Sequence, residues 1–361
     1  MFKGNGISKE QLTDTGEPCI LYGELYTKYK SEVISDIFSK TDIDTRKLVK
    51  SKANDVIIPC SGETAVDIAT ARCVPYDNIL LGGDLNIIRL YDCDGSFMSY
   101  QLNGKRKYDL AKVAQGVSVV HLYGDHLKGV RTYNPCLEEQ KKIAKLLSLL
   151  DERIATQNKI IEDLKKLKSA IIEKLYSEIQ GKEYSFGQLF DVVNERNKQM
   201  EYSNILSASQ EKGMMNRDDL NLDIQFERSN INTYKIVRKG DYVIHLRSFQ
   251  GGFAFSNKLG VCSPAYTILR PNNLLEYGYL SNYFTSQRFI KSLILVTYGI
   301  RDGRSINVDE WLRMKITIPP KEHQQYIVKV IGTFERKIED EEAYAAHLSK
   351  QKQYLLRQMF I

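Results

Sequence analysis

The sequence predicts an α/β protein in which two mixed α/β domains are joined by two long antiparallel coiled-coil helices, with an approximate internal two-fold. The main observation is a duplicated helical segment: residues 134–176 and 318–360 align without a gap, 184 positions apart. Each copy follows a globular stretch of similar length. A duplication of this kind builds a molecule of two similar halves, which suits a partner or substrate that also has two similar halves.

Four segments follow one another along the chain. We predict a first globular domain over residues 1–133, a helix over 134–180, a second globular domain over 181–317 and a second helix over 318–361. In both domains, short apolar or alternating runs between polar, glycine-containing loops are typical of strands. The clearest runs are residues 55–59, 85–90, 241–245 and 265–270, and the clearest helical pattern covers residues 280–295.

Each duplicated segment carries apolar residues at alternating spacings of three and four, which is typical of a coiled-coil seam. Polar residues interrupt the seam at the same two places in both copies: Gln157 and Lys168 in the first, Glu341 and Lys352 in the second. Because polar seam positions fix register and orientation, we expect antiparallel helices with Lys168 opposite Glu341 and Gln157 opposite Lys352. In the alternative, each helix packs only on its own domain and these positions face solvent.

The length of the helices predicts a spacing between the domains. A proline, Pro135 or Pro319, precedes each helix and suits its first turn. Roughly 40 residues at a rise of about 1.5 Å give a rod of about 60 Å. We expect domains at opposite ends of such a rod to be farther apart than one turn of B-DNA, which is about 34 Å, so that the rod acts as a ruler.

The two domains differ at their starts. The second opens with residues 184–191, YSFGQLFD, whereas the first begins almost directly at Lys3. We therefore expect the first domain to lack an edge strand that the second has.

Composition narrows the class of protein. The formal charge of +6 is too small to indicate nucleic acid by itself, so a DNA-binding surface needs local clusters such as Lys105-Arg106-Lys107. No apolar run reaches the roughly 20 residues that span a bilayer, and no signal segment is seen, so we expect a cytoplasmic protein. The six cysteines, which we expect to be reduced, and the five histidines lack metal-ligand spacing.

Catalytic signatures are not found. GNGISK lacks the spacing of a phosphate loop. Residues 134–137 faintly resemble the Asn-Pro-Pro-aromatic element of adenine methyltransferases, but their counterpart, residues 318–321, also stands at a helix start. No glycine-rich cofactor loop precedes either one, so we interpret both as structural.

Three kinds of loop carry side chains suited to phosphates and base edges. The first, residues 3–9 and 22–29, interleaves amide, hydroxyl, cationic and aromatic groups. The second, residues 247–252, follows a strand of the second domain and has its counterpart in residues 60–64. The third, residues 298–305, carries two arginines that suit bidentate contact with guanine or a phosphate clamp.

Several stretches together resemble a known family: GNGISK, PCILYGELYTKY, IPCSGET and RSFQGG in the domains, and the helical repeats that begin at Pro135 and Pro319. Over essentially its full length, the chain resembles the specificity subunit of bacterial type I restriction-modification enzymes. The resemblance implies two target-recognition domains, each of which reads one half of a split sequence in double-stranded DNA, with the helices setting the gap.

The resemblance also implies a non-catalytic chain without a cofactor of its own. Two modification subunits, which methylate adenine with S-adenosylmethionine, are expected around the helices, and restriction subunits join that core as translocase and nuclease. ATP and Mg are likewise expected on partner subunits. From loop position and this resemblance, we predict that these residues contact DNA: Lys3, Asn5, Lys9, Tyr22, Glu24, Tyr26, Lys28, Ser61, Glu63, Arg196, Asn197, Lys198, Arg247, Ser248, Gln250, Arg301 and Arg304.

Two other functions compete with DNA recognition. One is a protein-interaction scaffold whose coiled coil gathers partners without touching DNA. Specific retention on a DNA duplex, tested against salt and competitor, separates it from the first hypothesis. The other is a self-sufficient methyltransferase or nuclease, which the sequence disfavours because neither a cofactor loop nor metal-binding carboxylates are visible.

Overall fold

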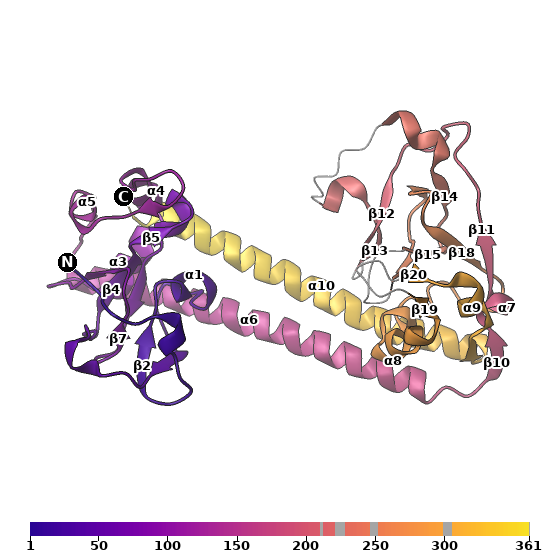
Figure 1. The fold of residues 1–361 in the computed structure, drawn as a ribbon, viewed down its shortest axis with the longest axis horizontal. Coiled ribbons are helices and arrows are strands. Elements are labelled where there is room, and N and C mark those ends of the chain that lie inside the picture. The colour runs from indigo at the N-terminus through magenta and orange to yellow at the C-terminus, as the bar shows by residue number, and fades with distance from the viewer. Residues whose placement is uncertain (210–211, 221–227, 246–251, 299–304, 361) are drawn as a thin grey trace. The chain divides into compact units, whose positions relative to one another are not determined.

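The computed structural model describes residues 1–209, 212–220, 228–245, 252–298 and 305–360 (Figure 1). The chain forms two compact units. Unit 1 contains Met1–Ile160 and Glu341–Ile361, and unit 2 contains Ile161–Asp340. Each unit therefore holds one mixed α/β domain and one half of each long helix. The four predicted domain boundaries stay a prediction.

Unit 1 is built around a four-stranded antiparallel sheet of strand order β1-β8-β4-β6, with a three-stranded sheet β3-β2-β7 and a pair β5-β9 beside it. Its strands are β1 Phe2–Lys3, β2 Glu17–Ile20, β3 Ser39–Thr41, β4 Asp55–Pro59, β5 Ser61–Gly62, β6 Arg72–Val74, β7 Leu80–Leu81, β8 Leu85–Ile88 and β9 Val120–His121. Its short helices are α1 Glu24–Thr27, α2 Ala65–Ile68, α3 Gly95–Asn103, α4 Lys107–Lys112 and α5 Gly124–Lys128, with 3-10 helices η1 Lys9–Gln11 and η2 Thr45–Lys47.

Unit 2 has a corresponding four-stranded sheet of order β11-β18-β15-β16 and four two-stranded pairs, β10-β21, β12-β13, β14-β17 and β19-β20. Its strands are β10 Lys182–Ser185, β11 Phe190–Val193, β12 Leu206–Ser209, β13 Gly213–Asn216, β14 Lys235–Val237, β15 Tyr242–Ile244, β16 Phe253–Phe255, β17 Gly260–Cys262, β18 Thr267–Pro271, β19 Thr297–Tyr298, β20 Ser305–Ile306 and β21 Lys315–Ile318. Its short helices are α7 Phe186–Leu189, α8 Gln287–Ser292 and α9 Val308–Arg313, with 3-10 helices η3 Arg217–Leu220, η4 Arg228–Thr233, η5 Tyr283–Thr285 and η6 Leu293–Val296.

The central strand of each sheet is buried on both faces, which explains its apolar run. Successive side chains of a strand point to opposite faces. In β4, Val56 and Ile58 enter one apolar core and Ile57 enters another. In β15, Tyr242 enters an aromatic core with Trp311, whereas its neighbour Val243 enters a second core. The predicted strands at residues 55–59, 85–90, 241–245 and 265–270 are therefore confirmed.

An ion pair repeats at the start of both central strands. Asp55 is buried and lies 2.7 Å from the guanidinium of Arg89, and buried Asp241 lies 2.9 Å from the guanidinium of Arg270. Each aspartate also accepts a 2.8 Å hydrogen bond from the backbone three residues earlier. The duplication seen in the helices thus extends into the domains, where the sequences have diverged.

Two sequence predictions about the domains need correction or refinement. The helix predicted over residues 280–295 is broken into η5, α8 and η6. In unit 1, β1 fills the same edge of the sheet that β11 fills in unit 2. What the described residues of unit 1 lack is a counterpart of the β10-β21 pair. The two apolar residues that β21 buries there, Ile316 and Ile318, correspond to the polar Thr132 and Asn134.

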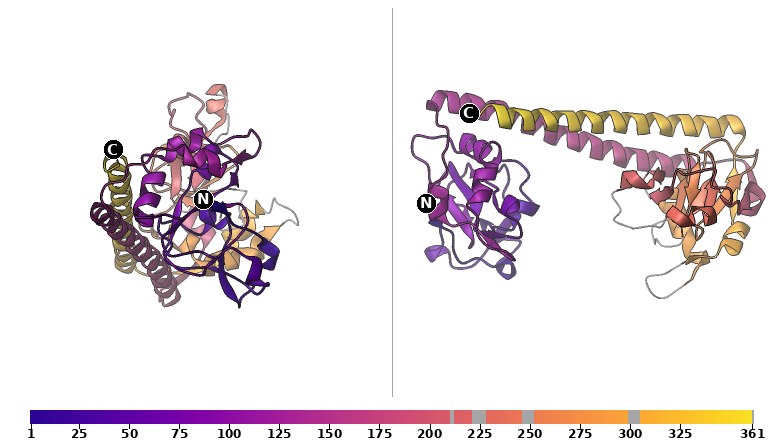
Figure 2. Two further views of the ribbon diagram at one scale, coloured as in Figure 1. Left: turned by 90° about the vertical axis from the view of Figure 1, so that its left-hand side faces the viewer. Right: turned by 90° about the horizontal axis from the view of Figure 1, so that it is seen from above.

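The two long helices are α6 Leu137–Ser177 and α10 Lys321–Gln358, as predicted. Within each unit, their halves lie side by side (Figure 1 and Figure 2). They run antiparallel, because higher residue numbers in α6 meet lower numbers in α10: Asp151 contacts Lys352, whereas Gln157 contacts Glu341. No helix of the described ranges is long and apolar enough to cross a membrane.

The predicted register of the helices is wrong. Lys168 does not meet Glu341 but lies 2.7 Å from Glu335, six positions earlier, and Lys352 lies 2.5 Å from Asp151, six positions before Gln157. The prediction paired polar seam residues with one another. In the structure, each of these lysines instead pairs with a carboxylate beside the apolar seam.

The observed contacts are equivalent under the repeat. Lys168 and Lys352 are 184 positions apart, and so are their partners Asp151 and Glu335. Gln157 donates to Glu341, and these two residues are also 184 positions apart. The repeat therefore maps this contact onto itself, because each residue takes the place of the other. Such a contact is expected where a surface is complementary to a copy of itself.

The domains are attached to the helices by a repeated joint. Gln140 donates to the carbonyl of Pro135 and accepts from the backbone N–H of Asp94, the N-cap residue of α3. Its counterpart Gln324 donates to the carbonyl of Pro319 and accepts from the backbone N–H of Glu276. Both glutamines are buried. Each fixes the first turn of its helix to the domain that precedes it.

The far ends of the helices complete the attachment. Phe360, beyond α10, packs on Phe97 of unit 1 at 5.2 Å between ring centroids. The counterpart of Phe360, Tyr176 of α6, packs on Tyr279 of unit 2 at 5.6 Å and donates its hydroxyl hydrogen to the carbonyl of Tyr279. Each domain is therefore held by the start of one helix and the end of the other.

The two equivalent lysines differ in burial, and this generates a test. Lys352 lies between Asp151 and Glu32, with all three side chains at most 14% exposed, whereas Lys168 is 24% and Glu335 41% exposed. We expect Lys352→Met to lower the free energy of unfolding by about 3–5 kcal/mol, because it leaves two buried carboxylates without their cation. The matched variant Lys168→Met should cost about 1 kcal/mol or less. Urea denaturation of the full chain measures both, and equal costs contradict the expectation.

Candidate nucleic-acid interface

Several predicted DNA contacts of unit 1 meet around the β5-β9 pair. Ser61 of β5 lies opposite His121 of β9 in an antiparallel register. The Tyr26 hydroxyl donates to the carbonyl oxygen of Ser61 at 3.1 Å, and the Ser61 hydroxyl donates to Asp84 at 3.3 Å. The segments around Tyr26 and Ser61, which are far apart in the sequence, are thereby joined.

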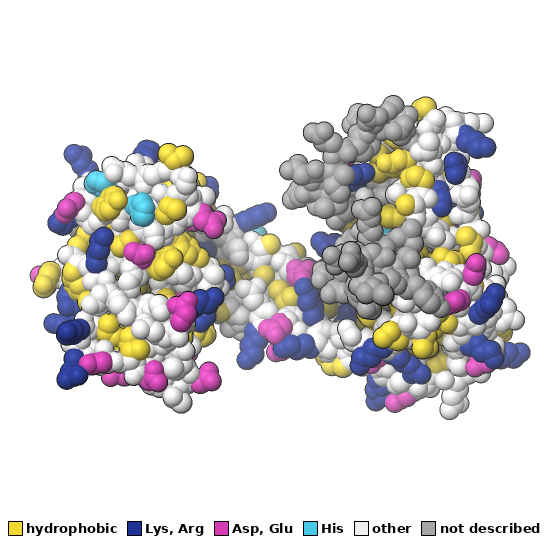
Figure 3. Space-filling model, viewed as in Figure 1, with side chains coloured by type: hydrophobic (Ala, Val, Ile, Leu, Met, Phe, Trp, Pro, Cys, Tyr) yellow, Lys and Arg dark blue, Asp and Glu magenta, His cyan; other side chains and the backbone are white. Residues whose placement is uncertain are grey.

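A cation and three rings lie beside this pair. The Lys3 ammonium lies 5.8 Å from the centroid of the Tyr123 ring. Tyr123, which is 44% exposed, stacks on His121 at 6.0 Å and meets the edge of His126 at 5.6 Å. Figure 3 shows histidine and hydrophobic side chains close together on the viewed face of this domain. Sequence analysis missed the histidines and Tyr123, because isolated aromatic residues carry no motif.

Other predicted contacts of unit 1 hold the fold together. The Asn5 amide donates to the carbonyl of Lys47 and accepts from the N–H of Val49. Buried Glu24 accepts from the Lys28 ammonium at 2.7 Å and from the N–H of Leu21 at 2.9 Å. These bonds tie the first loops to the domain. DNA contact by these side chains stays a prediction.

Three further predicted residues of unit 1, Lys9, Tyr22 and Glu63, are exposed. Lys9 begins η1, where Ser8 and Gln11 form a capping box. Tyr22 directly precedes the short turn into α1. None of the three is committed to a buried network, so their side chains are open to a partner.

In unit 2, the predicted residues Arg196, Asn197 and Lys198 have different environments. Arg196 and Lys198 are exposed. Asn197 is only 1% exposed; its amide donates to the carbonyl of Tyr202 at 2.7 Å and accepts from the N–H of Tyr202 at 3.1 Å. The asparagine thus closes a loop and presents the two cations on either side. Arg247, Ser248, Gln250, Arg301 and Arg304 lie outside the described residues.

Burial favours the neutral forms of three titratable side chains in the two units. Burial raises the pKa of Tyr26 well above its usual value, so its hydroxyl stays a neutral donor. Burial raises the pKa of the Cys60 thiol to about 11, which keeps it protonated near neutral pH. At the end of β15, burial lowers the pKa of His245. The described part of the chain contains no group of three His, Cys, Asp or Glu side chains able to hold a metal ion.

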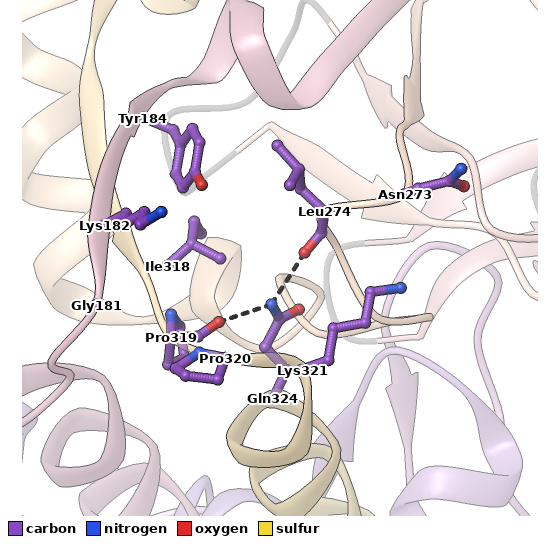
Figure 4. A pocket seen from close by; sticks show the side chains of 10 residues that line it. All are labelled: Gly181, Lys182, Tyr184, Asn273, Leu274, Ile318, Pro319, Pro320, Lys321 and Gln324. Carbon is purple, nitrogen blue, oxygen red and sulfur yellow. Dashed lines mark hydrogen bonds between the residues drawn. The ribbon is translucent and has the colours of Figure 1, made fainter.

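A pocket of about 280 Å³ lies at the joint between β10 and the start of α10 (Figure 4). Tyr184, Leu274 and Ile318 form much of its wall. Gln324 faces it, but its amide donates to the carbonyls of Leu274 and Pro319, as the dashed lines show. The pocket belongs to the attachment of the helix and adds no reactive group.

Comparison with known proteins identifies the family. A family model described as "Type I restriction modification DNA specificity domain" matches residues 2–166 and again residues 181–348. The type I restriction enzyme MjaVIII specificity subunit of Methanocaldococcus jannaschii is 29% identical over 158 residues, which are 43% of this chain and 35% of the relative. The putative MjaX specificity subunit of the same organism is 25% identical over 254 residues, 64% of this chain and 58% of the relative. The chain thus spans only part of the length of these relatives.

Solved structures show the same fold. The S subunit of a type I restriction-modification system from M. genitalium superposes with a TM-score of 0.58 at 17% identity, covering 100% of this chain and 93% of that one. A chain from a study of complex assembly and conformational transition of the type I R-M system gives a TM-score of 0.57 at 16% identity, covering 90% and 86%. Two mixed α/β domains joined by two packed helices are therefore a known architecture.

The contrast between neighbouring residues of unit 2 gives a prediction. We expect Asn197→Ala to lower the free energy of unfolding by about 1–3 kcal/mol, because it leaves buried backbone groups of Tyr202 without their partner. Lys198→Ala should change it by less than about 0.5 kcal/mol, because that side chain is exposed. Urea denaturation of the two variants checks this. An unchanged free energy of unfolding in Asn197→Ala would show that the loop does not need the hydrogen bonds of this side chain.

Proposed function

This chain belongs to the family of type I restriction modification DNA specificity domains, and from that premise we propose that it is the DNA-recognition subunit of a type I restriction-modification complex. In this proposal, each unit reads one half of a bipartite target in double-stranded DNA. The observation that carries it is the repetition itself: the family model matches twice, once over each domain with its following helix. A recognition module present twice suits a target in two parts.

The chemistry of unit 1 supports binding to DNA. The surface around β5 and β9 carries an ammonium, hydroxyls, exposed rings and imidazoles. Ammonium groups contact phosphates, and polar side chains read base edges by hydrogen bonds. The exposed cations Arg196 and Lys198 give unit 2 similar means. The proposed contacts outside the described residues, including Arg247, Gln250, Arg301 and Arg304, stand on loop position and on the family.

We further propose that the helices are the assembly surface for the partner subunits. The seam between α6 and α10 is buried, yet α6 carries a second apolar stripe, Leu146, Leu149, Ile160 and Leu167, each at least 41% exposed. An apolar stripe on a helix that is already packed suits a further protein. Two modification subunits would bind here, with restriction subunits added to that core.

In such a complex, this chain binds and positions DNA, and the partners perform the chemistry. The modification subunits would hold S-adenosylmethionine and methylate adenine, and the restriction subunits would use ATP and Mg. The protected thiol of Cys60 and the neutral hydroxyl of Tyr26 agree with a non-catalytic role. We place the complex in the cytoplasm, where its DNA is.

The proposal is tested with the complex of this chain and its modification subunits. We expect it to methylate adenine in one bipartite sequence, found by mapping methylated adenines in host DNA with and without this gene. Sequence-specific retention on that duplex should persist against competitor DNA and weaken as salt rises. A complex that assembles but shows no preference among sequences would favour the protein-interaction scaffold.

A second prediction concerns the independence of the two halves. Replacing Arg247, Gln250, Arg301 or Arg304 by alanine should reduce discrimination in one half-site by about 1–3 kcal/mol for a side chain that contacts a base, and leave the other half unchanged. Methylation of duplexes altered in one half at a time measures this. Uniform weakening on all sequences with a shallower salt dependence would assign these side chains to phosphates.

A further inference from the structure

A hairpin in unit 1 corresponds to one of the loops proposed to read DNA in unit 2. In both units, a two-residue strand and a short helix precede the long helix: β9 and α5 in unit 1, β20 and α9 in unit 2. The repeat spacing of 184 matches buried Leu127 of α5 with buried Trp311 of α9. The residues just before β9, 116–119, therefore correspond to those just before β20, which include Arg301 and Arg304.

The hairpin of unit 1 has a defined conformation. Gln115 and His121 close it with two backbone hydrogen bonds of 2.9 and 2.7 Å. Gly116 adopts φ +128°, and a Cβ atom there would lie 2.1 Å from the carbonyl oxygen of Val119, so only glycine fits. Val120 is buried among the apolar core residues beneath. The tip is therefore held by the two backbone hydrogen bonds at its base and by β9, whose residue Val120 is buried.

Apolar side chains stand at this tip. Val117 is 98% exposed and Val119 is 52% exposed. The hairpin also carries His121, which pairs with Ser61 of the candidate interface. The turn thus presents two exposed valines on the same hairpin as His121, which lies opposite Ser61 in the strand pair. Such a mixture of apolar and hydrogen-bonding groups matches the major groove, where thymine alone offers a methyl group beside its acceptor oxygen.

We propose that the hairpin of residues 115–121 reads the half-site of unit 1 and that Val117 selects thymine by contact with its 5-methyl group. This rests on the proposed function and adds a specificity-determining residue to it. In unit 1, apolar contact by a valine would then discriminate, whereas the corresponding sequence positions of unit 2 include arginines, which suit guanine or phosphate.

The test removes the methyl group of thymine and the methyl groups of Val117, separately and together. With the complex of this chain and its modification subunits, methylation rates are measured on duplexes in which each thymine of the target is replaced, one at a time, by uracil, which lacks the methyl. We expect one position at which the native complex loses about threefold to fivefold in kcat/KM, the effect of one buried methyl group. At that position, Val117→Ala should lose the same factor on thymine and nothing further on uracil.

The control is Val192→Ala in β11, a valine that is 52% exposed in the other unit. It should keep the native response to uracil at every position. Because Val117 packs against nothing, Val117→Ala should also keep the native thermal midpoint, which separates a lost contact from a lost fold.

Two results overturn the inference while leaving the proposed function standing. One is a sequence-selective complex in which no thymine responds to loss of its methyl, or in which Val117→Ala responds as the native chain does. The other is an equal loss on thymine and uracil at every position, which would make Val117 a wedge or a spacer. A complex without any sequence preference would instead refute the proposed function.

Discussion

The contact between Gln157 and Glu341 is the constraint on which the arrangement of the helices depends. Because the two residues occupy the same place in the two repeats, their meeting fixes the register of α6 against α10. With the register set, each lysine of the seam reaches the equivalent carboxylate, Lys168 to Glu335 and Lys352 to Asp151. A hydrogen-bonded polar pair inside an apolar seam costs stability but leaves few other registers open, since a shifted helix would bury these groups without partners.

The same contacts have been adapted differently in the two units. In unit 1, Lys352 also pairs with Glu32 of the domain and faces the ring of Tyr100, so the helix and the domain share one buried ionic cluster. In unit 2, the Tyr176 ring packs against Tyr279 and Tyr283, where unit 1 has the Phe97–Phe360 contact beside its ionic cluster. In unit 1, these contacts attach the end of α10 to the domain that precedes α6. In unit 2, they attach the end of α6 to the domain that precedes α10. A repeated chain can therefore diverge in detail while the attachment of each domain is kept.

Elements with a periodic apolar pattern could be predicted from the sequence, whereas the residue pairs that contact one another could not. The long helices and the central strands follow from the spacing of apolar residues, a signal that is summed over many positions. The antiparallel direction follows from the matched polar positions of the seam and is confirmed, although the residue pairs predicted from those positions are wrong. The register could not be derived, because a lysine has several carboxylates within reach of its long side chain and the sequence does not rank Glu335 against Glu341. The helix expected over residues 280–295 is interrupted at Ser286, whose backbone is extended and whose side chain caps α8 by accepting from the N–H of Phe289.

For the candidate interface, loop position identified Tyr26 and Ser61, which the fold brings together. It also selected Glu24 and Asn197, whose side chains are buried and hydrogen-bonded. Polarity alone cannot distinguish a side chain that closes a loop from one that reaches a partner. His121 and Tyr123 were missed because they join the surface only through the β5-β9 pairing and the ring contacts beside it, which are not local in sequence.

Under the proposed function, the repeat lets one scaffold read two half-sites of different sequence. The joints at Gln140 and Gln324 are kept between the units and attach each domain to its helix, and the ion pairs at Asp55 and Asp241 are kept within the sheets. At the tip of the unit 1 hairpin, by contrast, the Val117 side chain is 98% exposed. Val117 can therefore change with little loss of stability. Under the proposed function, a new half-site could then be read through a side chain that the fold does not need, while the scaffold beneath it stays the same.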